Sequence, residues 1–130
     1  MKNLVCLFSI LLASSAYAGL TPKRQALYRC VSLDENSGVD DAFIYRSNLG
    51  SRNTFHEIKV NSLENGQIKH YYKKVNLLSR YEGRVQEFTT GNFRIRVDKV
   101  RSAIDGNFWA FARIPSHEVH STNWSCKDLN

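Results

Sequence analysis

The chain has 130 residues, of which 42% are hydrophobic, and a formal net charge of +6. This length corresponds to one domain, and no internal repeat, low-complexity tract or linker divides it. Beyond residues 1–18 no apolar run approaches the roughly 20 residues that a membrane-spanning helix needs, which excludes a transmembrane anchor from the mature chain.

Residues 1–18 have the pattern of a secretory signal peptide. Lys2 supplies a positive charge, Leu4–Leu12 is a short apolar run, and Ala16-Tyr17-Ala18 is a small-x-small cleavage site. Cleavage there would leave residues 19–130 as a single mature domain of 130 − 18 = 112 residues. We therefore expect an exported protein, either periplasmic or secreted.

Export changes how the cysteines are interpreted. Removal of the leader takes Cys6 with it and leaves Cys30 and Cys126. Two cysteines in an exported chain most often form a disulfide. This bridge would close a loop of about 97 residues and stabilise the fold by about 4–5 kcal/mol. The alternative is two separate buried thiols, and no C-x-x-C redox motif is present.

Turn signals separate segments rich in β-branched and aromatic residues, which is typical of a small all-β meander. Asn65-Gly66 is the strongest of these signals, because a type I′ hairpin turn requires positive φ at both central positions. The segment 76–83 is ambiguous, since Leu77-Leu78 could begin a helical turn or another strand. The expected strands are residues 26–33, 42–47, 55–63, 67–75, 84–90, 93–100, 108–114 and 119–126.

The segment 93–98 alternates between apolar and polar residues. A strand with this period buries one face and exposes the other. We expect Arg94 and Arg96 to face solvent. The residues expected to be buried are Phe93, Ile95 and Val97.

These features predict an all-β fold, a single small antiparallel up-and-down meander of seven to eight strands. Short connections between sequential strands favour a barrel or a curled sandwich. A disulfide between the first and last strands, at Cys30 and Cys126, fits closure because it would bring the two sheet edges together.

The positive charge is concentrated in one segment. Residues 69–84 contain five Lys or Arg against one Glu, a net +4, whereas the whole mature chain carries 17 − 12 = +5. Three tyrosines lie in the same segment, and cations interleaved with aromatic rings suit anionic ligands. The candidate binding residues are Lys69, Tyr71, Tyr72, Lys73, Lys74, Arg80, Tyr81 and Arg84.

A plainer interpretation is that Lys69 and Lys73 form the solvated face of an edge strand, where lysine discourages edge pairing. If the segment binds a ligand, the expected partners are an anionic polymer such as an acidic glycan, a lipid head group, or an acidic patch of another exported protein. Nucleic acid is not the expected ligand of an exported protein. The sequence carries no signal for the oligomeric state.

We identify no catalytic or metal-binding pattern. His117 and His120 are three residues apart, so on a strand their rings would point to opposite faces. Their spacing is not the H-E-x-x-H of a zinc helix, and no G-x-S-x-G motif occurs. We therefore expect no catalytic residue, no metal site and no cofactor.

Four aromatic residues near the C-terminus have two possible roles. Trp109 and Phe111 share one face of their predicted strand, and Phe108 and Trp124 lie nearby in the chain. They could line a barrel cavity for an apolar ligand, or they could fill the core of a small domain.

The Tyr28-Arg29-Cys30 segment is similar to the first strand of exported bacterial lysozyme inhibitors, which are small disulfide-bonded β-barrels. The likeness covers three residues, and we assign no residue role from it. The leading prediction is an exported, non-catalytic β-domain that binds an anionic ligand. The alternative is an inhibitor or interaction partner of another exported protein, such as a lysozyme or protease. A hydrolase would require a cleft with convergent titratable groups.

Overall fold

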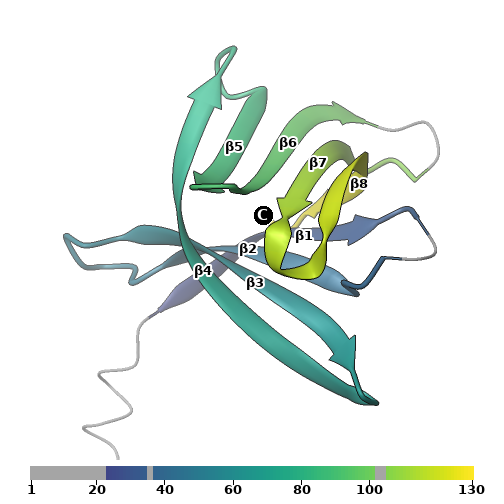
Figure 1. Cartoon of the computed structure of the whole chain (residues 1–130). Helices are drawn as coiled ribbons and strands as arrows, with labels where there is room; N and C mark the ends of the chain where they lie inside the picture. The colour runs from purple at the N-terminus through teal and green to yellow at the C-terminus, as the bar shows by residue number, and fades with distance from the viewer. Residues whose placement is uncertain (1–22, 35–36, 102–104) are drawn as a thin grey trace, which may run out of the picture.

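The structure is a computed structural model that describes residues 23–34, 37–101 and 105–130. Eight antiparallel strands follow one another around a closed barrel (Figure 1). The last strand pairs with the first, so the prediction of an up-and-down meander is confirmed as a barrel rather than a sandwich. The predicted signal peptide, residues 1–18, lies outside the described residues.

The strands agree closely with those expected from the sequence, and their ends differ by at most two residues except in β4, which continues from residue 75 to Arg80. The chain order is β1 (Arg24–Ser32), β2 (Asp41–Ser47), β3 (Phe55–Glu64), β4 (Gln67–Arg80), β5 (Val85–Thr90), β6 (Phe93–Arg101), β7 (Phe108–Ile114), the 3₁₀ turn η1 (Pro115–His117) and β8 (Val119–Asp128). Part of the turn expected at 34–38 lies outside the described residues.

β4 is longer than expected because it changes partner. Its first part, residues 67–75, pairs with β3, and Asn76–Arg80 then pairs with β5. The ambiguous Leu77-Leu78 pair therefore belongs to a continuous 14-residue strand and begins no helical turn. Leu77 packs against the core and Leu78 is exposed. Figure 1 shows β4 leaving β3 and rising to meet β5.

The turn between β3 and β4 has the backbone that its sequence predicts. Asn65 has a φ of 52° and Gly66 a φ of 77°. Positive values at both positions define the type I′ geometry that two-residue hairpins favour. Glu64 and Gln67 are consequently the pair that closes the hairpin, and this sets the register of β3 against β4.

Inward-facing side chains fill the barrel. Eight strands leave an interior that side chains can just occupy. Phe108 and Trp124 are part of this core, so the structure assigns both residues to packing. The Tyr28 hydroxyl donates to Gln86 Oε1 at 2.6 Å, and burial, followed by the charge of Asp128, raises the pKa of Tyr28 to about 12. The largest fully buried side chains are Trp124, Phe88, Ile44, Ile58, Ile95, Ile114, Val60 and Val97.

The alternation predicted for β6 is confirmed. Ile95 and Val97 are fully buried and Arg94 and Arg96 are exposed, while Phe93, expected to be buried, is partly buried and packs against the core. The outward side of β6 therefore carries two arginines toward solvent.

The predicted disulfide is confirmed. Cys30 and Cys126 are bonded with an S–S distance of 2.03 Å, and they occupy opposite positions in the ladder between β1 and β8. The bridge lies in the pair of strands that closes the barrel.

η1 is the single helical element in the described ranges. Pro115 begins it and ends β7, as the sequence predicts, because proline lacks the N–H that a continuing strand would use. In the part of the chain that is described, no helix has the length and apolarity to cross a membrane.

Candidate functional site

The eight candidate binding residues fall into three groups. Lys69, Tyr71 and Lys73 lie on the side of β4 that faces inward, since their partners in β3 are all buried. They are exposed nonetheless, because no further strand of the described chain covers residues 67–75 of β4.

Tyr72 and Lys74 lie on the outward side of β4 and contact neighbouring strands. The Arg24 guanidinium is 5.3 Å from the centroid of the Tyr72 ring. Lys74 Nζ is 4.8 Å from the centroid of the Phe55 ring. Both candidates are therefore already engaged in cation–π contacts within the protein.

Arg80, Tyr81 and Arg84 lie at the far end of β4 and in the turn that follows. Arg80 is six residues beyond Lys74, which corresponds to about 20 Å along an extended strand. The basic and aromatic segment does not form one contiguous pocket: these three candidates line one hollow, and Tyr71, Tyr72 and Lys73 line another.

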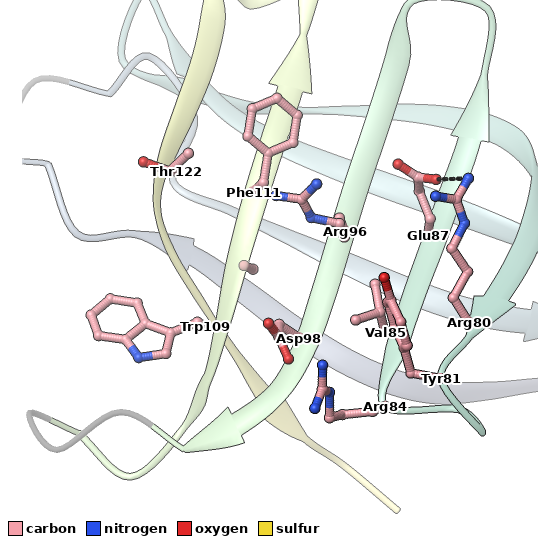
Figure 2. Close-up of a pocket in the computed structure, with 11 residues that line it drawn as sticks. Arg80, Tyr81, Arg84, Val85, Glu87, Arg96, Asp98, Trp109, Phe111 and Thr122 are labelled. Carbon is pink, nitrogen blue, oxygen red and sulfur yellow. Dashed lines mark ion pairs between the residues drawn. The ribbon is translucent and has the colours of Figure 1, made fainter.

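This hollow, which we call the arginine pocket, has a volume of about 380 Å³. It lies on the outside of the barrel, and Figure 2 shows its lining side chains on β4, the β4–β5 turn, β5, β6, β7 and β8. The lining residues are Arg80, Tyr81, Arg84, Val85, Glu87, Arg96, Asp98, Trp109, Ala110, Phe111 and Thr122.

Strand register places most of these side chains in two rows across the sheet. The first row is Arg80, Val85, Asp98 and Trp109, and the second is Glu87, Arg96 and Phe111. Directly opposite residues in an antiparallel ladder have Cβ atoms about 5 Å apart. The second row therefore places the cation Arg96 directly beside the Phe111 ring, whereas Arg80 and Trp109 at the two ends of the first row are three strand spacings, about 14 Å, apart.

The turn between β4 and β5 holds Tyr81 in a left-handed backbone conformation. Tyr81 has a φ of 53°, Glu82 a φ of 57° and Gly83 a φ of 86°. A non-glycine residue in this region costs on the order of 1 kcal/mol, and such strain is typical of functional sites. The Tyr81 side chain is 70% exposed, and the Arg84 guanidinium lies 5.2 Å from its ring centroid.

Two arginines of the pocket are available to bind an anion. Among the described residues, neither Arg84 nor Arg96 has a carboxylate oxygen within 4.0 Å. The Arg96 guanidinium lies 5.4 Å from the centroid of the Phe111 ring. A guanidinium stacked on a ring keeps its in-plane N–H donors free for a carboxylate, sulfate or phosphate.

The two carboxylates of the pocket differ in their partners. Glu87, only 7% exposed, is held by Arg94 Nε at 3.1 Å and lies 4.0 Å from Arg80 Nη2. Asp98 Oδ1 is buried and has no hydrogen-bond partner. A buried acceptor without a donor is unfavourable, but because this oxygen is shielded from solvent it is also out of reach of a ligand in the pocket.

Sequence reasoning missed Arg96 as a binding candidate, and it considered Trp109 and Phe111 only as the lining of an interior cavity or as part of the core, which the structure corrects. The alternation of β6 already indicated that Arg96 is exposed, and the strand 108–114 placed Trp109 and Phe111 on one side. The structure shows that this side is the outside of the barrel, where both aromatic residues are partly exposed. Trp109 and Phe111 share the pocket with Arg84 because of the register between neighbouring strands, which no local sequence pattern indicates.

The histidines do not converge. The His117 ring lies edge-on to Tyr71, and the His120 ring lies edge-on to Phe111. Within the described ranges there is no group of three or more His, Cys, Asp or Glu that could hold a metal ion.

Comparison with known proteins gives no match for this chain, since no family model, curated protein or solved structure is significantly similar to it.

Proposed function

We propose that this protein is an exported, non-catalytic binding protein and that the arginine pocket holds an anionic glycan. The observation that carries the proposal is the presence of two arginines, Arg84 and Arg96, with no carboxylate within 4.0 Å, in the described part of the chain, beside exposed aromatic rings. A guanidinium binds a carboxylate or sulfate through two parallel hydrogen bonds.

The remaining features of the pocket distinguish a sugar from a bare anion. The rings of Tyr81, Trp109 and Phe111 offer flat apolar faces on which a sugar ring stacks. An inorganic ion would not use these faces.

The test is isothermal titration with an oligogalacturonate, whose sugars carry carboxylates, and with its neutral methyl ester as matched ligand. We expect the acid to bind and the ester to bind far more weakly. Affinity for the acid should fall as salt rises from about 0.05 to 0.5 M, because exposed charges are screened within about 10 Å or less.

Variants assign the binding to the pocket. The double variant Arg84→Ala/Arg96→Ala should lose about tenfold or more in affinity, equivalent to about 1.4 kcal/mol. The matched control is Arg52→Ala/Lys127→Ala, which removes the same charge from exposed positions outside the pocket. Equal losses of affinity in the two double variants would show that the effect comes from net charge alone, which would contradict the proposal.

Two further outcomes decide the ligand class. Trp109→Ala should weaken binding of the oligosaccharide without changing its salt dependence, because it removes a stacking face and no charge. Binding to vesicles of an anionic phospholipid, with no binding to the oligosaccharide, would replace the glycan by a lipid head group.

A further inference from the structure

The first part of β4 has a free edge. Residues 67–75 pair with β3 on one side, and β5 pairs only with Asn76–Arg80 on the other. No strand of the described chain pairs with the free side of 67–75. Every second residue of an antiparallel strand directs its N–H and C=O to the same side, so this edge presents a row of unpaired backbone groups to solvent.

The edge borders a groove of about 450 Å³. One wall is β4, at Tyr71, Tyr72 and Lys73, and the base includes Val60 of β3. The opposite wall is the β5–β6 turn, residues 90–93, and the start of η1, residues 115–116. The groove is thus a space between a strand edge and the rest of the barrel, which is the setting in which an extended peptide adds to a sheet.

The hairpin that carries this edge projects from the barrel, as Figure 1 shows for the far end of β3 and β4. Every residue from Gln67 to Lys74 is exposed, and Leu63 and Ile68 near the tip are each 58% exposed. A partner can therefore approach the edge without displacing another element of the described chain.

The charge of the edge indicates the partner. β4 contains Lys69, Lys73 and Lys74 within the free part and has no Asp or Glu. None of the three lysines has a carboxylate oxygen within 4.0 Å in the described ranges. Lys69 and Lys73 project from the inward side of β4, the side on which the groove lies. Alternate side chains of an added strand would therefore lie next to these two lysines.

We infer that the free edge of β4 binds an extended acidic segment of another exported polypeptide as an additional strand of the barrel. Opposite charges across neighbouring strands are stabilising and like charges are not. A second copy of this chain fits poorly, because antiparallel pairing centred on Tyr71 would place Lys69 of one copy opposite Lys73 of the other.

Lysines on an edge also prevent unwanted pairing. That role accounts for the three lysines but not for the groove beside them. The two roles are compatible, since the same charges that repel neutral or basic strands attract an acidic one. The inference concerns a surface separate from the arginine pocket and does not rest on it.

The probe is a synthetic peptide of about nine residues that alternates Glu with Val, a length that matches the free edge. Two matched peptides have the same length. One alternates Lys with Val, and the other alternates Glu with Pro, which keeps the charge but cannot pair as a strand. The readouts are the dissociation constant and the hydrogen-exchange protection of the amides from Gln67 to Val75.

We expect only the Glu/Val peptide to bind and to protect these amides. Lys69→Glu/Lys73→Glu should weaken its binding about tenfold or more, and the control Arg52→Glu/Lys127→Glu, with the same change in net charge, should not. Arg84→Ala/Arg96→Ala should leave peptide binding unchanged, which separates this inference from the proposed glycan site.

A backbone variant tests strand addition directly. Counting from the pair Glu64–Gln67 that closes the turn, ladder alternation directs the N–H of Tyr72 to the free side. Tyr72→Pro removes that donor, and Tyr72→Thr removes the same ring but keeps the donor. The melting temperatures of the two variants are compared first. Tyr72→Pro should then bind the peptide about tenfold more weakly than Tyr72→Thr.

Three results would overturn the inference. Equal binding of the Glu/Val and Glu/Pro peptides would show charge attraction without strand pairing. Equal binding of the Glu/Val peptide by Tyr72→Pro and Tyr72→Thr would also show charge attraction without strand pairing. Protection of Gln67–Val75 that rises with protein concentration in the absence of peptide would identify a second copy as the occupant.

Discussion

Cys30 in β1 and Cys126 in β8 lie directly opposite each other, with their Cα atoms 4.0 Å apart, in the ladder that closes the barrel. They are 96 positions apart in the sequence. A link between such distant positions restricts the unfolded chain over most of the domain, and the entropic cost of closing a loop grows with its length. The bridge therefore links the strand pair that lies farthest apart in the sequence.

Removing this bridge should destabilise the protein without changing its fold. We expect Cys30→Ala/Cys126→Ala to lower the free energy of unfolding by about 2–5 kcal/mol. Urea denaturation followed by tryptophan fluorescence measures the loss, because Trp124 is fully buried. The reduced wild-type protein should unfold at the same urea concentration as the double variant, and an unchanged midpoint in both would contradict the prediction.

Two adjacent residues of β6 should differ strongly in their effect on stability. Ile95→Ala should cost about 2–5 kcal/mol, because it removes a fully buried side chain from the core. Arg96→Ala should change stability by less than about 0.5 kcal/mol, because Arg96 is exposed and has no carboxylate within 4.0 Å in the described structure. Chemical denaturation of both variants tests which face of β6 is buried. Similar losses in the free energy of unfolding would show that the assignment of the buried face is wrong.

Tyr81→Asn should stabilise the protein and weaken ligand binding. Asparagine tolerates the left-handed backbone that Tyr81 adopts at a φ of 53°. Relief of that strain should raise the free energy of unfolding by up to about 1 kcal/mol. Loss of the ring should reduce oligogalacturonate affinity in the same titration that tests the arginine pocket. A variant that is less stable and binds normally would remove the functional interpretation of this turn.

Stability should depend on the protonation of His56. The ring is half-buried and lies 5.6 Å from the centroid of Phe88. Burial, followed by the positive charge of Arg46, holds the pKa of His56 below its usual 6.5. Below about pH 6.5 the His56 ring takes up a proton in the unfolded chain but stays neutral in the folded protein, and this difference favours unfolding. The contribution of the neutral ring to the free energy of unfolding is therefore complete above that pH, and it is lost as the pH falls through the lowered pKa.

The comparison uses His56→Gln, which cannot titrate. Its melting temperature should change less between pH 8 and pH 5 than that of the wild-type protein. The other histidines are present in both proteins and contribute equally, so an identical pH dependence would rule out His56 as the source.

The fold could be predicted in most of its elements because the relevant signals are local. The positive φ values that Asn65-Gly66 favours set the hairpin, and the alternation around Ile95 set the buried face of β6. The course of β4 through Leu77-Leu78 was ambiguous, because two adjacent apolar residues fit a helix or a strand. It was resolved by the change of partner from β3 to β5, a tertiary property.

The site was predictable only in part for the same reason. Arg80, Tyr81 and Arg84 belong to one charged segment that the sequence makes visible. Arg96 and Trp109 join them through the register of three further strand pairs. Charge and aromatic content identified the segment, but the position of each strand against the next determines which of its side chains share a pocket.

The two ends of the described chain lie side by side. Gln25 Nε2 donates to Asn130 Oδ1 at 2.8 Å, and the N–H of Leu129 donates to the Leu27 carbonyl at 3.0 Å. A short peptide linker could therefore join them, and new termini could be opened at the exposed Asn65-Gly66 turn. In such a circular permutant β4 would be the first strand and β3 the last, and their ladder would have to form without the turn that now directs it.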